Sequence, residues 1–395
     1  MSEIRDVYIV DAVRTPVGSF MGGLSSVPAP KLGSITIKAL LDRNKIEPAS
    51  VDEVIMGNVI QAGEKQAPAR QAAILAGLDV SVETMTINKV CGSGLKSVMI
   101  GAQSIALGDA DVVIAGGMEN MSQIPYLLPK AREGFKMGNQ SIVDAMLCDG
   151  LLDAYEDTHM GNYAELCARE YNITRDDQDD FAIESYKRAL KAIEEKSFND
   201  EIIPVEVPGR KGSVNIVSED EEPGKVKFDK IKTLRPVFEK EGTVTAANAS
   251  SINDGASAVL LMTKEKADEL GLKPMAKILK HAAAAKDPKW FTTAPIDAIN
   301  KVLAKANLSM DEIDLFEINE AFSVVSLTVN KELKLDPTKV NIHGGAVAIG
   351  HPIGASGARI FTTLLHAMKK RNSKYGLASL CIGGGEAVAV IVENI

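Results

Sequence analysis

Apolar and polar residues are arranged along the chain in blocks that predict a layered α/β protein. Four short apolar runs bounded by turn residues predict strands, at 7–10, 54–59, 111–117 and 258–262. Apolar residues spaced three and four positions apart predict helices, at 36–41, 67–75 and 95–106. The run at 111–117 is continuously apolar, which favours a sheet that is covered by helices on both faces.

The pattern changes in the middle of the chain, where proline, glycine, tyrosine and charged residues are interspersed. One clear helix is predicted there at 174–195, with a threonine cap and acidic residues in its first turn. The acidic stretch 219–225 is predicted to be a solvated loop. We therefore predict three domains: an N-terminal α/β domain, an inserted lobe and a C-terminal α/β domain, at 1–120 with 249–272, at 121–248 and at 273–395.

The second half of the chain repeats the first. The segment SVDEV at 50–54 recurs as SMDEI at 309–313, and the same offset takes Cys91 to Gly350, beside His351. A glycine-rich turn and a helical run follow both Cys91 and His351, and each helix leads to an apolar strand that ends in glycines. Two copies of one α/β unit are therefore expected, each with a reactive side chain at the end of a strand, where the sites of α/β proteins usually lie.

Composition narrows the class of protein. The chain has 395 residues, is 45% hydrophobic and 25% charged, and contains 32 glycines, which is typical of a multidomain globular α/β protein. Its net charge of −9 argues against a nucleic-acid-binding surface. No apolar run is expected to span a membrane, residues 1–6 lack a secretory signal, and residues 392–395 are not a peroxisomal address. Four scattered cysteines predict free thiols, no metal site and a cytoplasmic location.

Three side chains in glycine-rich turns could carry out acyl transfer. Cys91 lies at a strand-to-helix turn with Gly92 and Gly94, and a helix start favours the thiolate form of a cysteine. Cys91 could attack an acyl carbon, His351 could take its proton, and Cys381 could act as a general acid or base. Taken one at a time, the two cysteines could equally be core residues and the histidine a structural one.

At these positions the sequence resembles the thiolase family, over essentially the whole chain. The resemblance rests on separated motifs in a common order: NKVCGSG (88–94), GGMENMS (116–122), HMG (159–161), NEAF (319–322), GGAVAIGHPIGASGAR (344–359) and CIGGG (381–385). It implies duplicated α/β domains that form a five-layered α-β-α-β-α core with an inserted loop domain. It also implies acetyl-CoA C-acetyltransferase activity, in which two acetyl-CoA condense to acetoacetyl-CoA and coenzyme A, and the reverse thiolysis.

The resemblance assigns catalytic roles to five residues. Cys91 corresponds to the nucleophile that accepts the acyl group, and His351 to the base that activates it. Cys381 corresponds to the acid or base that moves the α-proton of the second acetyl-CoA. Asn319 is expected to hold a water that forms one oxyanion hole with His351, and the backbone N–H groups of Cys91 and Gly383 are expected to form the other.

The resemblance also implies how substrates bind. The inserted lobe corresponds to the coenzyme A-binding loop domain of the family, and eight residues match positions along its pantetheine and thioester channel: Leu151, His159, Met160, Ala246, Ala249, Ser250, Ala321 and Phe322. The expected partners are acetyl-CoA, acetoacetyl-CoA and coenzyme A, which are substrates, so that no cofactor is expected. A homotetramer built as a dimer of dimers is the expected assembly, without nucleic acid or membrane.

Three departures from the family pattern concern specificity and the last motif. The stretch 220–225 has no arginine where many members carry one near the adenine end of coenzyme A. Phe291 replaces a methionine that is common in bacterial members, which leaves short branched substrates open. The last motif continues as Gly385-Glu386-Ala387, where glutamine or methionine followed by glycine is commoner.

Two alternative functions stay open at this point. One is a degradative 3-ketoacyl-CoA thiolase of broader chain length, and the other is a catalytically dead thiolase-like protein that binds acyl-CoA or lipid. Gly92 after the nucleophile, where serine is the alternative, and the segment 118–121 favour the short-chain branch. The dead scaffold is disfavoured because no reactive position is missing from the chain.

Overall fold

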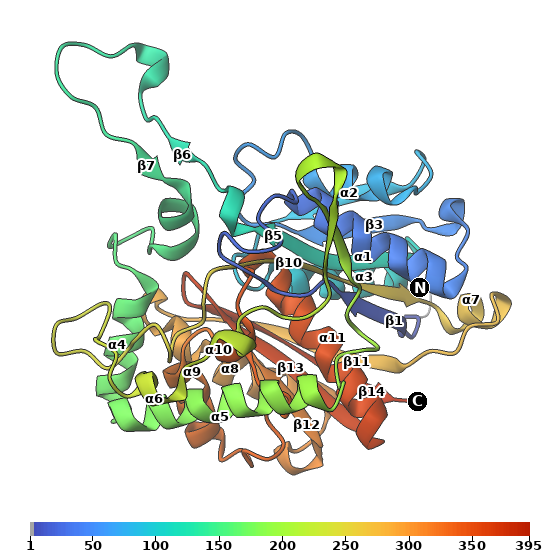
Figure 1. The fold of residues 1–395 in the computed structure, drawn as a ribbon. Helices are drawn as coiled ribbons and strands as arrows, with labels where there is room; N and C mark the ends of the chain where they lie inside the picture. Colours follow the sequence, from blue (N-terminus) through green and yellow to red (C-terminus); the bar gives the residue numbers. More distant parts are fainter. Residues whose placement is uncertain (1–3) are drawn as a thin grey trace.

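A mixed ten-stranded sheet forms the frame of the protein, in the computed structural model that describes residues 4–395 (Figure 1). The strand order is β12-β13-β14-β11-β1-β10-β5-β3-β4, and β2 pairs with β10. The strands are β1 (Tyr8–Arg14), β2 (Gly18–Ser19), β3 (Glu53–Gly57), β4 (Glu83–Ile87), β5 (Val112–Asn120), β10 (Asn253–Met262), β11 (Ala276–Ala285), β12 (Leu315–Ile318), β13 (Tyr375–Ile382) and β14 (Glu386–Asn394). Residues 1–3 of the segment considered for a secretory signal lie outside the described residues.

The sheet consists of two halves that meet at β1 and β11. These strands are paired at only two positions, Tyr8 with Lys277 and Ile9 with Ala276. In the first half β3 runs parallel to β4 and β5, and in the second half β12 runs parallel to β13. Each half thus contains parallel strands from one α/β unit, as the internal repeat predicts.

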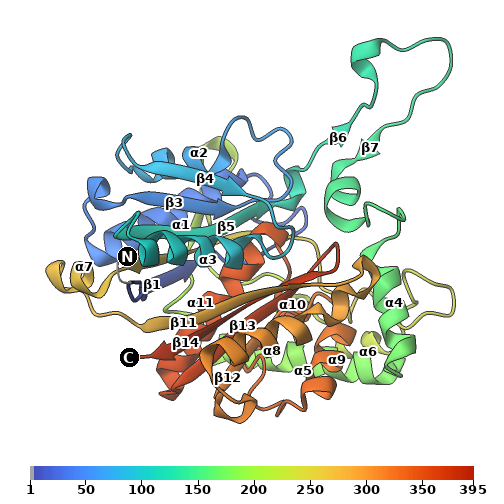
Figure 2. The ribbon, with the colours of Figure 1, turned by 180° about the vertical axis from the view of Figure 1, so that it is seen from behind.

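Three hydrophobic clusters divide the helices into layers. One cluster packs α1 (Ala29–Asn44) and α2 (Pro68–Ala76) on the outer face of the first half-sheet. A second cluster holds α3 (Ser93–Leu107) and α11 (Ile353–Arg371) between the two halves (Figure 1, Figure 2). A third packs α8 (Ala294–Ala306) on the outer face of the second half. The expected five-layered α-β-α-β-α core is therefore confirmed.

The two central helices approach each other at glycines. A Cβ atom on Gly94 of α3 would lie 2.7 Å from the backbone nitrogen of Ala358, and one on Gly357 of α11 would lie 2.4 Å from the nitrogen of Leu95. Both distances are shorter than any real contact of a Cβ atom. Glycine at these two positions therefore lets the helices that follow Cys91 and His351 touch along their backbones.

One helical segment is long and apolar enough to be compared with a membrane span. By length and composition alone, the segment Val90–Leu107, which contains α3, could cross a membrane. More than half of that window is buried inside the protein, where α3 forms part of the central layer. Its apolar character is accounted for by packing in the central layer, where most of the helix is covered.

The segment between β5 and β10 contains the predicted inserted lobe. Its helices are α4 (Met160–Glu170), α5 (Arg175–Glu194) and α6 (Phe228–Ile231), and α5 begins at the predicted cap, Thr174. Its two small hairpins are β6 (Tyr126–Leu127) with β7 (Val143–Asp144), and β8 (Val205–Pro208) with β9 (Val214–Val217). The β6–β7 arm projects away from the rest of the molecule (Figure 2). The domain boundaries proposed above stay a prediction.

The expectation that 219–225 is a solvated loop is wrong for Asp220. This side chain is buried and pairs with the fully buried Arg14, which also binds Glu201 at 2.6 Å. Asp220 further accepts a hydrogen bond from the backbone nitrogen of Val17. The loop is therefore attached to the first domain by a buried ion pair with a residue some two hundred positions away, which an acidic composition alone does not reveal.

Candidate active site

A cavity of about 360 Å³ lies where the two α/β units and the inserted lobe meet. Cys91, His351 and Gly383 line it. All eight residues that the resemblance placed along the substrate channel line the same cavity: Leu151, His159, Met160, Ala246, Ala249, Ser250, Ala321 and Phe322. The structure thus gathers residues from widely separated parts of the sequence around one space, and most of their side chains are apolar.

Cys91 lies in the turn between β4 and α3, as predicted. Val90 before it has a left-handed backbone (φ 44°), and the nitrogen atoms of Gly92 and Ser93 donate to the carbonyls of Lys89 and Val90. Burial raises the pKa of the Cys91 thiol to about 11, while hydrogen bonds from the backbone N–H groups of Gly383 and of Cys91 itself act in the opposite direction. The helix start therefore does not by itself produce a thiolate, and the nucleophile needs a base.

His351 is placed to be that base. Its Nδ1 lies 2.6 Å from the hydroxyl oxygen of Ser356, and this hydroxyl is 2.9 Å from the carbonyl oxygen of Pro352. Because the Ser356 hydroxyl donates to that carbonyl, it accepts the proton of Nδ1. Nε2 is then the unprotonated nitrogen, and it has no partner among residues 4–395. Burial lowers the pKa of His351 to about 3, which keeps the imidazole neutral and able to accept a proton.

A buried carboxylate holds the turn that follows His351. Glu119, at the end of β5, accepts hydrogen bonds from the backbone nitrogens of Val59, Ile60 and Gly354 at 2.9–3.2 Å. A Cβ atom on Gly354 would lie 2.5 Å from the Glu119 carboxylate, so glycine is required for this approach. The nitrogen of His351 itself donates to Asn253 at 2.8 Å. Both half-domains therefore contribute to the position of the histidine.

Cys381 and Asn319 lie outside the lining of the cavity. Cys381 is buried near the end of β13, and burial, followed by the nearby Cys91, raises the pKa of its thiol well above its ordinary value. Asn319 follows β12 and is also buried, and neither atom of its side-chain amide has a partner among the described residues. A buried amide without a protein partner suits a residue that holds a water, although its role stays a prediction.

His159 is a polar residue of the predicted substrate channel. Its hydrogen bonds show which ring nitrogen carries the proton. It caps α4, with Nδ1 accepting a hydrogen bond from the nitrogen of Gly161 at 3.0 Å. Its ring stacks on Phe238 with 4.6 Å between the ring centroids. Because Nδ1 is an acceptor and burial lowers the pKa of His159, the single proton lies on Nε2. The cavity therefore contains a neutral imidazole N–H donor.

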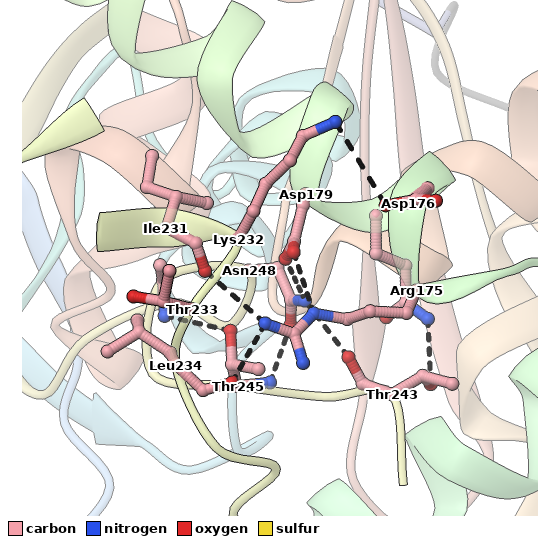
Figure 3. A network of polar contacts seen from close by, with 12 residues as sticks. Arg175, Asp176, Asp179, Ile231, Lys232, Thr233, Leu234, Thr243, Thr245 and Asn248 are labelled. Carbon is pink, nitrogen blue, oxygen red and sulfur yellow. Dashed lines mark hydrogen bonds and ion pairs between the residues drawn. The ribbon is translucent and has the colours of Figure 1, made fainter. Parts of the chain in front are cut away.

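One wall of the cavity is held by a polar network within the inserted lobe (Figure 3). Arg175 pairs with Asp179 at 2.7 Å and donates to the carbonyls of Ile231 and Leu234. Asp179 also accepts from the side-chain amide of Asn248 at 2.9 Å. These contacts fix the start of the loop that contributes six lining residues: Thr245, Ala246, Ala249, Ser250, Ser251 and Ile252.

Reasoning from the sequence missed several functional neighbours. Further residues line the cavity: Met121, Leu147, Gly150, Val237, Phe238, Thr245, Ser251, Ile252, Phe291 and Ile353. Phe291, singled out for substrate size, is buried and packs edge-on against Phe322 at 6.5 Å. Ser356 and Glu119 both lie inside quoted motifs, so their positions were marked. Their hydrogen bonds to the histidine turn became visible only in three dimensions.

The fold is duplicated, and its cavity brings a cysteine and a histidine beside two backbone N–H donors. These features define an enzyme of covalent acyl transfer. The chain belongs to the thiolase family: the family model described as "Thiolase, N-terminal domain" matches residues 7–265, and "Thiolase, C-terminal domain" matches residues 272–394.

Similar curated proteins cover the chain from end to end. An acetyl-CoA acetyltransferase of Schizosaccharomyces pombe is 54% identical over 391 residues, which is 99% of each chain. Proteins of the same name from Cupriavidus necator and Pseudomonas aeruginosa are 53% and 52% identical over 392 residues, or 99% of this chain and 100% of theirs.

Proposed function

We propose that the protein is an acetyl-CoA C-acetyltransferase, which condenses two acetyl-CoA to acetoacetyl-CoA and coenzyme A and catalyses the reverse thiolysis. The observation that carries this proposal is the cavity in which Cys91, the neutral His351 and the N–H of Gly383 meet beside an apolar channel. Relatives that are 50–54% identical over the full chain are named acetyl-CoA acetyltransferases, which supports the same substrates.

The first half-reaction transfers an acetyl group to Cys91. Nε2 of His351 takes the proton of the Cys91 thiol, and the sulfur attacks the carbonyl carbon of acetyl-CoA. The N–H groups of Cys91 and Gly383, which face the sulfur, stabilise the negative oxygen that forms. The bond between the carbonyl carbon and the coenzyme A sulfur then breaks, and the leaving thiolate receives the proton from His351.

The second half-reaction forms the carbon–carbon bond. Cys381, as a thiolate, removes an α-proton of the second acetyl-CoA, and the resulting enolate attacks the acetyl carbon on Cys91. The Cys91–carbon bond breaks, and the Cys91 sulfur receives the proton that Cys381 took.

The wider expectations are part of the same proposal. The largely apolar lining suits the pantetheine arm of coenzyme A, and Nε2 of His159 offers a donor for one of its amide carbonyls. A homotetramer is supported by the exposed apolar residues along the β6–β7 arm: Tyr126, Leu128, Phe135, Met137 and Ile142. Four free cysteines support a cytoplasmic location.

A series of thiolysis rates tests the proposal. With coenzyme A as the acceptor, acetoacetyl-CoA should be cleaved faster than 3-ketohexanoyl-CoA and 3-ketooctanoyl-CoA, because the closely packed Phe291 and Phe322 limit the acyl end of the cavity. Faster cleavage of the eight-carbon substrate would favour a degradative thiolase instead. If the purified protein released no coenzyme A from acetyl-CoA, a binding role without catalysis would replace the proposal.

A further inference from the structure

An ion pair connects the two catalytic turns across the boundary between the two α/β units. Nζ of Lys89, two residues before Cys91, lies 2.5 Å from a carboxylate oxygen of Glu386, three residues after Gly383. Both side chains are partly exposed, at 22% and 38%. Glu386 begins β14 and is paired with Ile382 of β13, so its backbone is fixed in the second half-sheet.

Few other contacts hold the two turns together. No backbone-to-backbone hydrogen bond joins 88–94 to 381–386 within the described part of the chain. Gly92 packs against Ile382 so closely that a Cβ atom there would lie 2.3 Å from the isoleucine side chain. Both turns contain left-handed backbone, at Val90, Gly384 and Gly385, so neither is part of a regular ladder at this point. Packing limits how near the turns come, and the ion pair opposes their separation.

The separation of the turns matters because the proposed oxyanion site is divided between them. One N–H comes from Cys91 and the other from Gly383, and both act to lower the pKa of the Cys91 thiol. Oxyanion donors act only when they are held at hydrogen-bonding distance from the developing charge. A second cation, Lys96 on α3, is also within the electrostatic influence of Lys89 and Glu386. Without the Glu386 charge, the repulsion between Lys89 and Lys96 would lose the opposing effect of this carboxylate.

We propose that Lys89 and Glu386 are positioning residues, whose ion pair holds the Gly383 N–H in register with Cys91. This inference rests on the acyl transfer proposed above. An exposed pair that serves stability alone typically contributes little, and its loss leaves chemistry unchanged. A misplacement of 1 Å in a catalytic constellation can cost about 10²-fold in rate. We expect a looser pair of turns to lower the rate of Cys91 acetylation by about three- to tenfold.

The experiment uses three variants: Glu386→Gln, Lys89→Met, and a double variant that exchanges the two charges, Lys89→Glu together with Glu386→Lys. Single-turnover acetylation by acetyl-CoA should slow about three- to tenfold in each single variant, with a smaller change in KM, and the exchanged pair should recover most of the rate. The matched control is Lys277→Met, which breaks an equally short pair with Asp6 outside the site. This control should acetylate at the wild-type rate.

Alkylation of Cys91 by iodoacetamide across pH gives a readout that needs no acyl substrate. Removal of a nearby negative charge would by itself lower the pKa of Cys91 and speed alkylation at fixed pH. Loss of the Gly383 hydrogen bond raises that pKa, so the positioning role predicts slower alkylation in Glu386→Gln. Unchanged or faster alkylation, together with an unchanged acetylation rate, would overturn the inference even if thermal stability fell.

The two proposals fail in different ways. If the wild-type protein is not acetylated by acetyl-CoA, the proposed function fails, while slower alkylation in the single variants would still support the positioning role. If the wild-type protein is acetylated and all variants match it in both assays, only the positioning role fails. Thermal unfolding of each variant checks that the comparison is made between folded proteins.

Discussion

Replacement of Ser356 by alanine tests the assignment of His351 as the base. Ser356 is fully buried, and its hydroxyl is the partner of His351 Nδ1 at 2.6 Å. During acylation His351 becomes positively charged, and a hydrogen bond to a charged group contributes about 1.5–3 kcal/mol. Without it Nδ1–H stays unpaired in a buried site, or the proton moves to Nε2 and blocks the acceptor. We therefore expect acetylation of Cys91 to slow by about 10- to 150-fold.

The assay is single-turnover acetylation of Cys91 by acetyl-CoA, followed by intact-protein mass spectrometry. A matched control is Thr362→Val on the same helix α11, where the hydroxyl shares a buried hydrogen bond of 2.9 Å with Ser257. The control should lose stability through that bond and acetylate at the wild-type rate. If Ser356→Ala acetylates as fast as the control, the hydroxyl does not set the protonated nitrogen of His351, and the reasoning is refuted.

Three further predictions concern the two cysteines and two buried charges. Cys91→Ala should form no acyl-enzyme, whereas Cys381→Ala should still be acetylated and should lose overall condensation by at least about 10²–10⁴-fold, read by radiolabelled acetyl-CoA and protein mass. Arg14→Met leaves two buried carboxylates unpaired and should cost about 3–5 kcal/mol in the free energy of unfolding, measured in urea; a loss below 1 kcal/mol would contradict this. Burial raises the pKa of Glu119 to about 7. The stability that the protonated Glu119 contributes is therefore complete below its unfolded pKa and is lost as pH rises through 7, because the unfolded state releases the proton first. Unfolding of Glu119→Gln between pH 5 and pH 8 should lack that decline, which is up to about 3 kcal/mol in the wild type; an equal decline in both proteins would contradict this.

Local pattern was sufficient for much of the fold. The apolar runs and glycine turns located the strands and the turns at Cys91 and His351, because a buried parallel strand and an amphipathic helix leave distinct periods. The eight positions that the family resemblance assigned to the substrate channel all line one cavity, and their role in binding stays a prediction. The pairing of β1 with β11 was not foreseen, since two paired residues leave no period to detect.

The errors of the sequence reasoning arose where distant groups override local ones. A helix start alone suggested a thiolate at Cys91, but burial among residues of both halves outweighs it. The acidic composition of 219–225 suggested solvent, but Arg14 draws Asp220 inside.

The glycine contact between α3 and α11 ties catalysis to cooperative folding. The backbones that touch at Gly94 and Gly357 belong to the helices that begin just after Cys91 and His351, so the active site has no hinge between these turns and the centre of the molecule. Regions with their own low opening energy are usually loops and edges with few buried contacts. The helices that follow the nucleophile and the base lie instead in the most deeply enclosed layer. Loss of activity on heating is therefore expected to coincide with global unfolding rather than to precede it.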